Sequence, residues 1–172
     1  MDNLKEILAK HERWIWSNGK EGERADFWRN PNLFILREVD LEEANLAGAN
    51  FFSVDLSGVN LTGANLSWAN FTEADLSGAN LTNAILTSAD LTKANLSWAK
   101  LINALLTNAD LTNANLSGAD LSKANLSGAI LTKTNFRLAK LIGANLTGAE
   151  IAKAACLAEA DLTGVIGWPP ER

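Results

Sequence analysis

The most constraining feature of this sequence is a strict five-residue period. From Leu36 to Ile151, every fifth residue is Leu, Phe or Ile, twenty-four times without a slip, and Ala stands two places before most of them. On an α-helix, five residues turn through about 500°, which scatters these side chains around the cylinder. On a flat strand, an odd period places them alternately on opposite faces. The pattern therefore predicts two inward residues at strand spacing, then a two-residue corner, so that the chain winds into a solenoid.

The repeated unit itself can be recognised. Runs such as ANLS at residues 64–67 and ADLT at residues 109–112 resemble the A-[D/N]-L-x-x signature of the pentapeptide-repeat family, over about three quarters of the chain. The resemblance implies an all-β solenoid, a right-handed quadrilateral β-helix with four pentapeptides per coil and about six to seven coils. The chain gives weak support of its own for twenty residues per coil, because KLI at residues 100–102 recurs at residues 140–142.

These patterns divide the chain into four segments. We predict a capping helix in residues 1–20, an irregular lead-in over residues 21–38, the repeat β-helix over residues 39–167 and a short tail at residues 168–172. Residues 11–27, HERWIWSNGKEGERADF, resemble the segment that precedes some bacterial, in particular cyanobacterial, pentapeptide arrays.

Both ends of the solenoid need covering, because an open end exposes apolar core and unpaired backbone groups. Residues 3–17 have apolar side chains at helical spacing and predict an amphipathic helix. We expect this helix to close the first coil. The residues expected to face its core are Leu4, Ile7, Leu8 and Trp14. At the other end, two prolines stop the ladder, and Trp168 is expected to fold over the exposed floor.

Two places depart from the five-residue phase. Residues 25–27 (ADF) look like a repeat, but Phe27 lies fourteen residues before Leu41. The NPN turn sequence that follows predicts a loop near residues 28–33. Leu162 lies eleven residues after Ile151, which indicates one inserted residue around residues 155–157 and a bulge in the last full coil.

Functional residues are sought among the outward columns, where the repeat consensus is broken. The residue before each core Leu is usually Asp or Asn, as expected for short side chains that bond backbone at corners. Ile85 and Leu105 break this rule one coil apart, and Ile102 is expected around the adjacent corner. Together they predict an exposed apolar spot for a protein partner. Isolated surface residues without a role are the alternative.

Two tryptophans, Trp68 and Trp98, occupy the second corner position, and their column neighbours are glycine or serine. We expect each indole to lie flat over the coils above and below it. An exposed aromatic contact for a ligand or a protein is the alternative.

The charge pattern narrows the possible functions. A net charge of −5 is only mildly acidic, so we expect no direct binding to nucleic acid. Some pentapeptide-repeat proteins bind type II topoisomerases as dimers that mimic DNA, which requires long negative faces. The acidic columns here are short, so a DNA-mimic binder of a type II topoisomerase is kept as the alternative function. Threonine columns are similar to those of ice-binding solenoids, a remote alternative, because hydroxyls here occur on all four sides.

An enzyme is not expected. Acid–base catalysis needs titratable groups that converge in a cleft, and a convex rod offers none. His11 lies on the helix stripe, and Cys156 has no histidine beside it in sequence. No phosphate-loop, zinc or calcium pattern is found. We predict a non-catalytic protein without cofactor or metal, a protein-interaction or scaffold module whose partner the sequence does not identify.

The remaining expectations concern location and assembly. The charged N-terminal residues lack the apolar region of a signal peptide, and no stretch has the length of a membrane span. The single cysteine is compatible with a reducing compartment. These features predict a cytoplasmic protein that does not bind membranes. The family resemblance implies a weak homodimer through the C-terminal coil.

Overall fold

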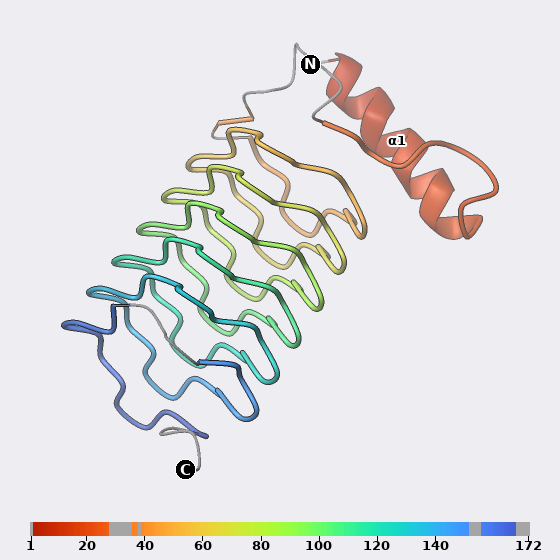
Figure 1. Cartoon of the computed structure of the whole chain (residues 1–172). Helices are drawn as coiled ribbons and strands as arrows, with labels where there is room; N and C mark the ends of the chain where they lie inside the picture. The colour runs from red at the N-terminus through yellow and green to blue at the C-terminus, as the bar shows by residue number, and fades with distance from the viewer. Residues whose placement is uncertain (1, 28–35, 38, 152–155, 168–172) are drawn as a thin grey trace.

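A computed structural model of the chain describes residues 2–27, 36–37, 39–151 and 156–167. Among these residues it has one helix, α1 (Asp2–Trp16), at the N-terminal end, and a stack of coils that leads from there to the C-terminus (Figure 1). The helix lies where the apolar spacing predicts residues 3–17. Within the described ranges, no helix is long and apolar enough to cross a membrane.

Parallel backbone pairing sets the length of a coil at twenty residues. Residues that precede a core Leu or Phe pair with the residue twenty positions later, from Asp40 with Asn60 to Ile130 with Glu150. Four such ladders run along the stack, because four pentapeptides fill one turn. The pairs are isolated bridges rather than long strands, since a corner follows each one within two residues. The twenty-residue coil that the family resemblance implies is confirmed by this pairing.

Each corner is a tight turn closed by a backbone hydrogen bond. At the corner after Leu91, the Ala94 N–H donates to the Leu91 carbonyl at 3.0 Å. Lys93, the third residue of this turn, has a φ of 59°, which is typical of a type II turn. The same positive φ recurs at every fifth residue from 43 to 148. Glycine suits this conformation, so a bulky residue at such a corner is strained.

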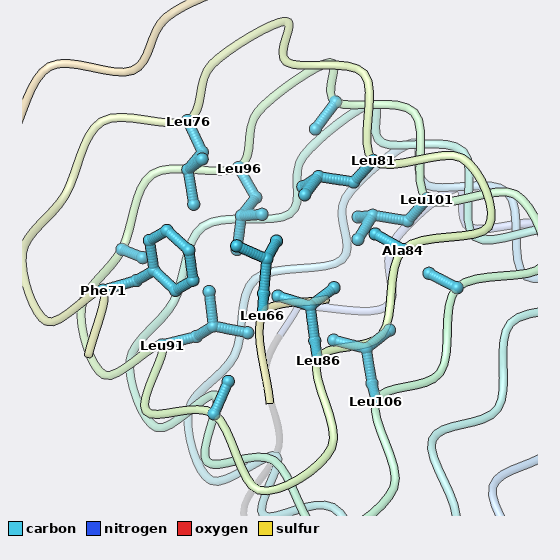
Figure 2. Close-up of a cluster of buried hydrophobic side chains, with 14 of the residues drawn as sticks. Leu66, Phe71, Leu76, Leu81, Ala84, Leu86, Leu91, Leu96, Leu101 and Leu106 are labelled. Atoms are coloured by element: carbon cyan, nitrogen blue, oxygen red, sulfur yellow. The ribbon is translucent and has the colours of Figure 1, made fainter. Parts of the chain in front are cut away.

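The core is built from the Leu and Ala columns that the sequence predicts. Nearly all of these side chains are fully buried, and equivalent residues of successive coils stack in columns, such as Leu66, Leu86 and Leu106 (Figure 2). Thr134 replaces Ala in one column and is also fully buried. Its hydroxyl donates a 2.8 Å hydrogen bond to the Leu111 carbonyl. The polar group is therefore satisfied without disturbing the column.

The first repeat joins the stack out of phase, as the sequence predicts. Asp26 pairs with Asn50, twenty-four residues later, and the regular offset is restored at Leu36. Four additional residues therefore separate Phe27 from Leu36, and the loop predicted near residues 28–33 lies outside the described residues. The Phe27 ring stacks on Phe51 with centroids 4.6 Å apart, so the core continues across the change of phase.

The second change of phase comes near the C-terminus. Ile130 pairs with Glu150 at the regular offset of twenty, whereas Lys140 pairs with Asp161 at twenty-one. The single inserted residue is confirmed by this pairing. The Phe136 N–H already bonds the Cys156 carbonyl at 3.0 Å, one residue beyond the regular partner. The insertion therefore precedes Cys156 and is not centred on it.

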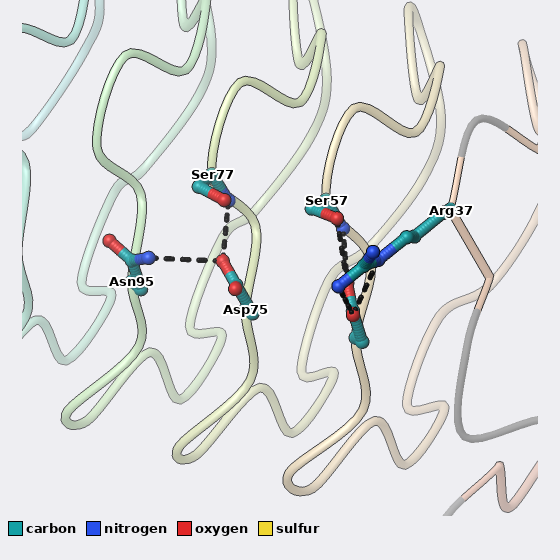
Figure 3. Close-up of polar contacts among 6 residues, drawn as sticks. Arg37, Ser57, Asp75, Ser77 and Asn95 are labelled. Carbon is teal, nitrogen blue, oxygen red and sulfur yellow. Dashed lines mark hydrogen bonds and ion pairs between the residues drawn. The ribbon is translucent and has the colours of Figure 1, made fainter.

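The polar residue before each core position forms hydrogen bonds within its own corner and to a neighbouring coil. Asp75 Oδ1 accepts a hydrogen bond from the Ser77 backbone N–H at 2.9 Å and another from Asn95 Nδ2 at 3.0 Å (Figure 3). The first bond closes the corner, and the second links consecutive coils. In other ladders, Asn65 and Asn70 also accept the corner N–H at Oδ1, and each donates its Nδ2 to the asparagine of the preceding coil. The structural role predicted for this Asp/Asn position is confirmed.

Candidate interaction surface

An apolar area lies on one side of the solenoid. Ile85 and Leu105 pair across consecutive coils. Leu105 is 42% exposed, and Ile85 is half-buried. Ile102 is also half-buried and lies at the corner that leads into Leu105. The structure thus pairs Ile85 with Leu105, and the shared spot with Ile102 stays a prediction.

Sequence reasoning missed two further apolar residues on this side, Ile142 and Ile166, which are both exposed. Ile142 lies two coils after Ile102 in the same column, and the recurrence of KLI at residues 140–142 was a signal for it. Ile166 belongs to the column of Leu105, with Asn125 and Asn145 between them. The inserted residue conceals this relationship in the sequence. We use the term apolar side for these five residues: Ile85, Ile102, Leu105, Ile142 and Ile166.

The two corner tryptophans are more exposed than the sequence predicts. Trp68 is 69% and Trp98 is 67% exposed. Trp98 covers Gly118 of the next coil, where an added Cβ would lie 2.6 Å from its Cε3, but nothing lies within 4 Å of a Cβ at Gly78. The expectation that this indole covers the coils on both sides is therefore wrong.

The expectation also fails at Trp68, for a different reason. An added Cβ at Gly48, in the preceding coil, would lie 3.6 Å from Cη2 of Trp14. The Trp14 indole, on α1, therefore lies over Gly48, where we expected the Trp68 indole. Because the corner of Trp68 follows Asn65, which pairs with Ile85, Trp68 borders the apolar side. Trp98 lies at the opposite corner, half a turn around the solenoid from Trp68.

A pocket of about 310 Å³ lies between the C-terminal end of α1 and the first coils. Its lining residues from the helix and the following turn are Trp14, Ile15, Asn18 and Gly19, and those from the coils are Ala47, Gly48 and Trp68. No pattern in the sequence predicts this pocket, because it depends on where the helix docks and not on the repeat.

The predicted capping residues divide into two groups. Leu4, Ile7 and Leu8 are partly buried and pack against the core. Trp14 lies instead at the Gly48 corner and stacks on His11, with ring centroids 5.6 Å apart. Trp168 lies outside the described residues.

Several surface charges pair between coils. Arg37 reaches Asp55 at 2.7 Å, and Lys93 Nζ lies 2.8 Å from Glu73 Oε1. Burial opposes ionisation of Asp55, but hydrogen bonds from Ser57 and Arg37 outweigh it and lower the pKa of that carboxyl. Glu73 raises the pKa of Lys93 through its hydrogen bond and its charge. These exposed pairs contribute little to stability, but they interrupt the negative surface.

The residues considered for chemistry lie apart. His11 lies on the buried face of α1, whereas Cys156 is exposed near the opposite end. In the described part of the chain, no group of three or more His, Cys, Asp or Glu residues could hold a metal ion.

The repeats match a known family. The family described as "Pentapeptide repeats (8 copies)" matches over residues 35–72, 49–87, 89–128 and 119–154. No functionally curated protein matches the sequence significantly.

Solved structures of similar proteins are also pentapeptide-repeat proteins. Rfr23 from the cyanobacterium Cyanothece 51142 is 32% identical, with 81% of this chain and 90% of that chain covered and a TM-score of 0.38. A thylakoid-lumen protein from Arabidopsis thaliana is 30% identical, covering 67% of this chain and 66% of that one, a little under two thirds, with a TM-score of 0.40. HetL from the cyanobacterium Nostoc sp. strain PCC 7120, a pentapeptide-repeat protein involved in heterocyst differentiation regulation, is 27% identical, with 90% of this chain and 94% of that chain covered and a TM-score of 0.32.

Proposed function

Because the chain belongs to the pentapeptide-repeat family, we propose that it is a non-catalytic scaffold that binds a protein partner through its apolar side. We also propose that the solenoid is a right-handed, four-sided helix of about six to seven coils, and that the protein is located in the cytoplasm.

The observation that carries the proposal is the loss of polar ladder residues at Ile85 and Leu105. Elsewhere in this column, Asn65 Nδ2 donates to Asn45 Oδ1 at 3.2 Å, and Asn65 Oδ1 accepts the Ser67 N–H of its own corner. Ile and Leu cannot make these bonds, each worth about 0.5–1.5 kcal/mol. These two residues therefore add no side-chain hydrogen bond to the ladder, and they leave apolar surface in contact with water. Exposed apolar area of this kind is typical of a protein-binding surface.

A pull-down with matched variants tests this role. The double change Ile85→Asn and Leu105→Asn restores the residue found at Asn65 and Asn125 of the same column, so the coils should stay intact. The control is Ile130→Asn, which makes the same chemical change on a neighbouring side. We expect the double variant to lose a specific partner that the wild type and the control both capture. Equal capture by all three proteins would contradict the proposal.

The same experiment separates the DNA-mimic alternative. The acidic residues that pair across coils, Asp90 with Asp110 and Asp55 with Asp75, form short columns. If the captured protein is a type II topoisomerase, and if its binding depends on Asp90 and Asp110 but not on Ile85 and Leu105, the alternative replaces the apolar-side scaffold.

A further inference from the structure

We propose that the pocket between α1 and the first coils binds a small, neutral, planar aromatic molecule between Trp14 and Trp68. Its volume of about 310 Å³ falls at the lower end of the range for small-molecule sites. The proposal is independent of the scaffold role, because none of the five apolar-side residues lines this pocket.

Trp14 provides one wall that the fold holds in place. His11 stacks on one face of its indole, with the two ring planes inclined by 11°. Both edges of the indole lie against glycines. An added Cβ at Gly19 would be 3.4 Å from Nε1, and one at Gly48 would be 3.6 Å from Cη2. The ring is therefore fixed before any ligand arrives, which lowers the entropic cost of binding.

Trp68 provides the second wall, and the fold does not account for it. Its φ is 58°, a conformation that suits glycine and strains a bulky residue. Gly48 and Gly128 occupy the same corner in other coils, with φ of 70° and 66°. The Trp68 indole is exposed and does not pack in the hydrophobic core. An exposed tryptophan that lines a pocket points to a binding role.

The lining residues define the chemistry of the ligand. None of the described lining residues carries a titratable side chain, so the pocket offers no charged group to pair with an ionic ligand. The two indoles present π surfaces, which favour stacking or edge contacts with another aromatic ring. Ile15 and Ala47 extend the apolar wall, and Asn18 adds one amide at the helix end. These groups fit a flat apolar ring with at most one polar substituent.

The test uses indole as the probe and ¹H–¹⁵N NMR of the ¹⁵N-labelled full chain, in which unlabelled indole gives no signal. We expect saturable shifts of the Trp14 and Trp68 indole N–H signals at millimolar indole. Trp68→Gly should weaken binding by about tenfold or more. Trp98→Gly is the matched control, because it removes an equally strained and exposed tryptophan that does not line the pocket. It should leave the affinity unchanged.

Three results would overturn the proposal. The first is the absence of saturable shifts in the wild type. The second is unchanged affinity in Trp68→Gly, whose fold is checked by its core amide signals. The third is equal or tighter binding of cyclohexanol or tetramethylammonium, which would rule out a planar or a neutral ligand respectively.

Discussion

His11 Nδ1 accepts a 3.1 Å hydrogen bond from the backbone N–H of Ala25, which ties α1 to the first repeat. Because Nδ1 is the acceptor, the imidazole is neutral with its proton on Nε2. Burial and the Arg24 guanidinium lower the pKa of His11, whereas the Ala47 carbonyl opposes them. Nε2 is buried and makes no hydrogen bond to any described residue. A proton on Nδ1 would therefore break the link between helix and repeat.

We expect the protein to lose stability as pH falls below about 6.5, the usual pKa of histidine in an unfolded chain. Since the pKa of His11 is lowered in the folded state, the unfolded state binds the proton more readily, and each step down in pH favours unfolding until the folded pKa is reached. Urea unfolding at about pH 7.5 and about pH 5.5 measures the free energy of unfolding on either side of the pH range in which histidine titrates.

His11→Gln is the control for this prediction, because its amide oxygen can accept the Ala25 bond but does not titrate. Its stability should fall less between the two pH values. Asp55 and Asp161 also have lowered pKa values, but their stabilisation is lost only at more acidic pH. An equal fall in the wild type and in His11→Gln would assign the pH dependence to another group.

The inward register makes a second prediction. Leu96→Ala should lower the free energy of unfolding by about 2–5 kcal/mol, because Leu96 is fully buried and its truncation leaves a cavity. Thr92→Ala, on the outer surface of the same coil, should cost little. Denaturant unfolding of both variants measures the difference. Similar losses at the two sites would mean that the assignment of inward and outward positions is wrong.

Strain at the corners makes a third prediction. Leu138 has a φ of 60° and is exposed. We expect Leu138→Gly to be more stable than Leu138→Ala by about 0.5–1 kcal/mol, since relief of left-handed strain exceeds the entropy that glycine gains on unfolding. Gly78→Ala tests the reverse change in the same column, at a φ of 66° with open space around the added Cβ. Thermal or urea unfolding that ranks alanine above glycine at both sites would contradict this account.

The repeat determines how much the sequence could predict. Each pentapeptide meets the same surroundings, so the burial of Leu96 and the corner bonds of Asp75 follow from the five-residue pattern alone. The one-residue insertion was visible too, because a single slip in a strict period is easy to detect. Its exact place, before Cys156, required the pairing of Phe136.

The candidate sites were harder to predict, because they depend on contacts outside the repeat. The place over Gly48 is taken by Trp14 and not by Trp68, which follows from the docking of α1 on the corner. No periodic pattern relates residue 14 to residue 48. Ile166 was missed for a simpler reason, since its column is counted correctly only with the twenty-one-residue offset.

The role of α1 as a cap makes a fourth prediction. Leu4, Ile7 and Leu8 pack against the core, so removal of residues 1–20 should expose that core and cause aggregation or open-ended association. Trp16→Ala is the control, because Trp16 lies on the same helix but is almost fully exposed. Size-exclusion chromatography with light scattering distinguishes the two. A truncated protein that stays monomeric and equally stable would rule out the capping role.

The last prediction concerns the opposite end. The Leu141 and Gly143 N–H groups donate to the carbonyls of Asp161 and Thr163 in the following coil. Their counterparts, Leu162 and Gly164, have no later coil to bond among the described residues. Contact with the same surface of a second copy would supply partners for these donors, so we predict a weak two-fold dimer. Light scattering over a range of concentrations, on the intact protein and on Trp168→Ala, measures this association. A monomer in both at high concentration would exclude the dimer, whereas association only after the change would identify Trp168 as a plug that keeps the native chain monomeric.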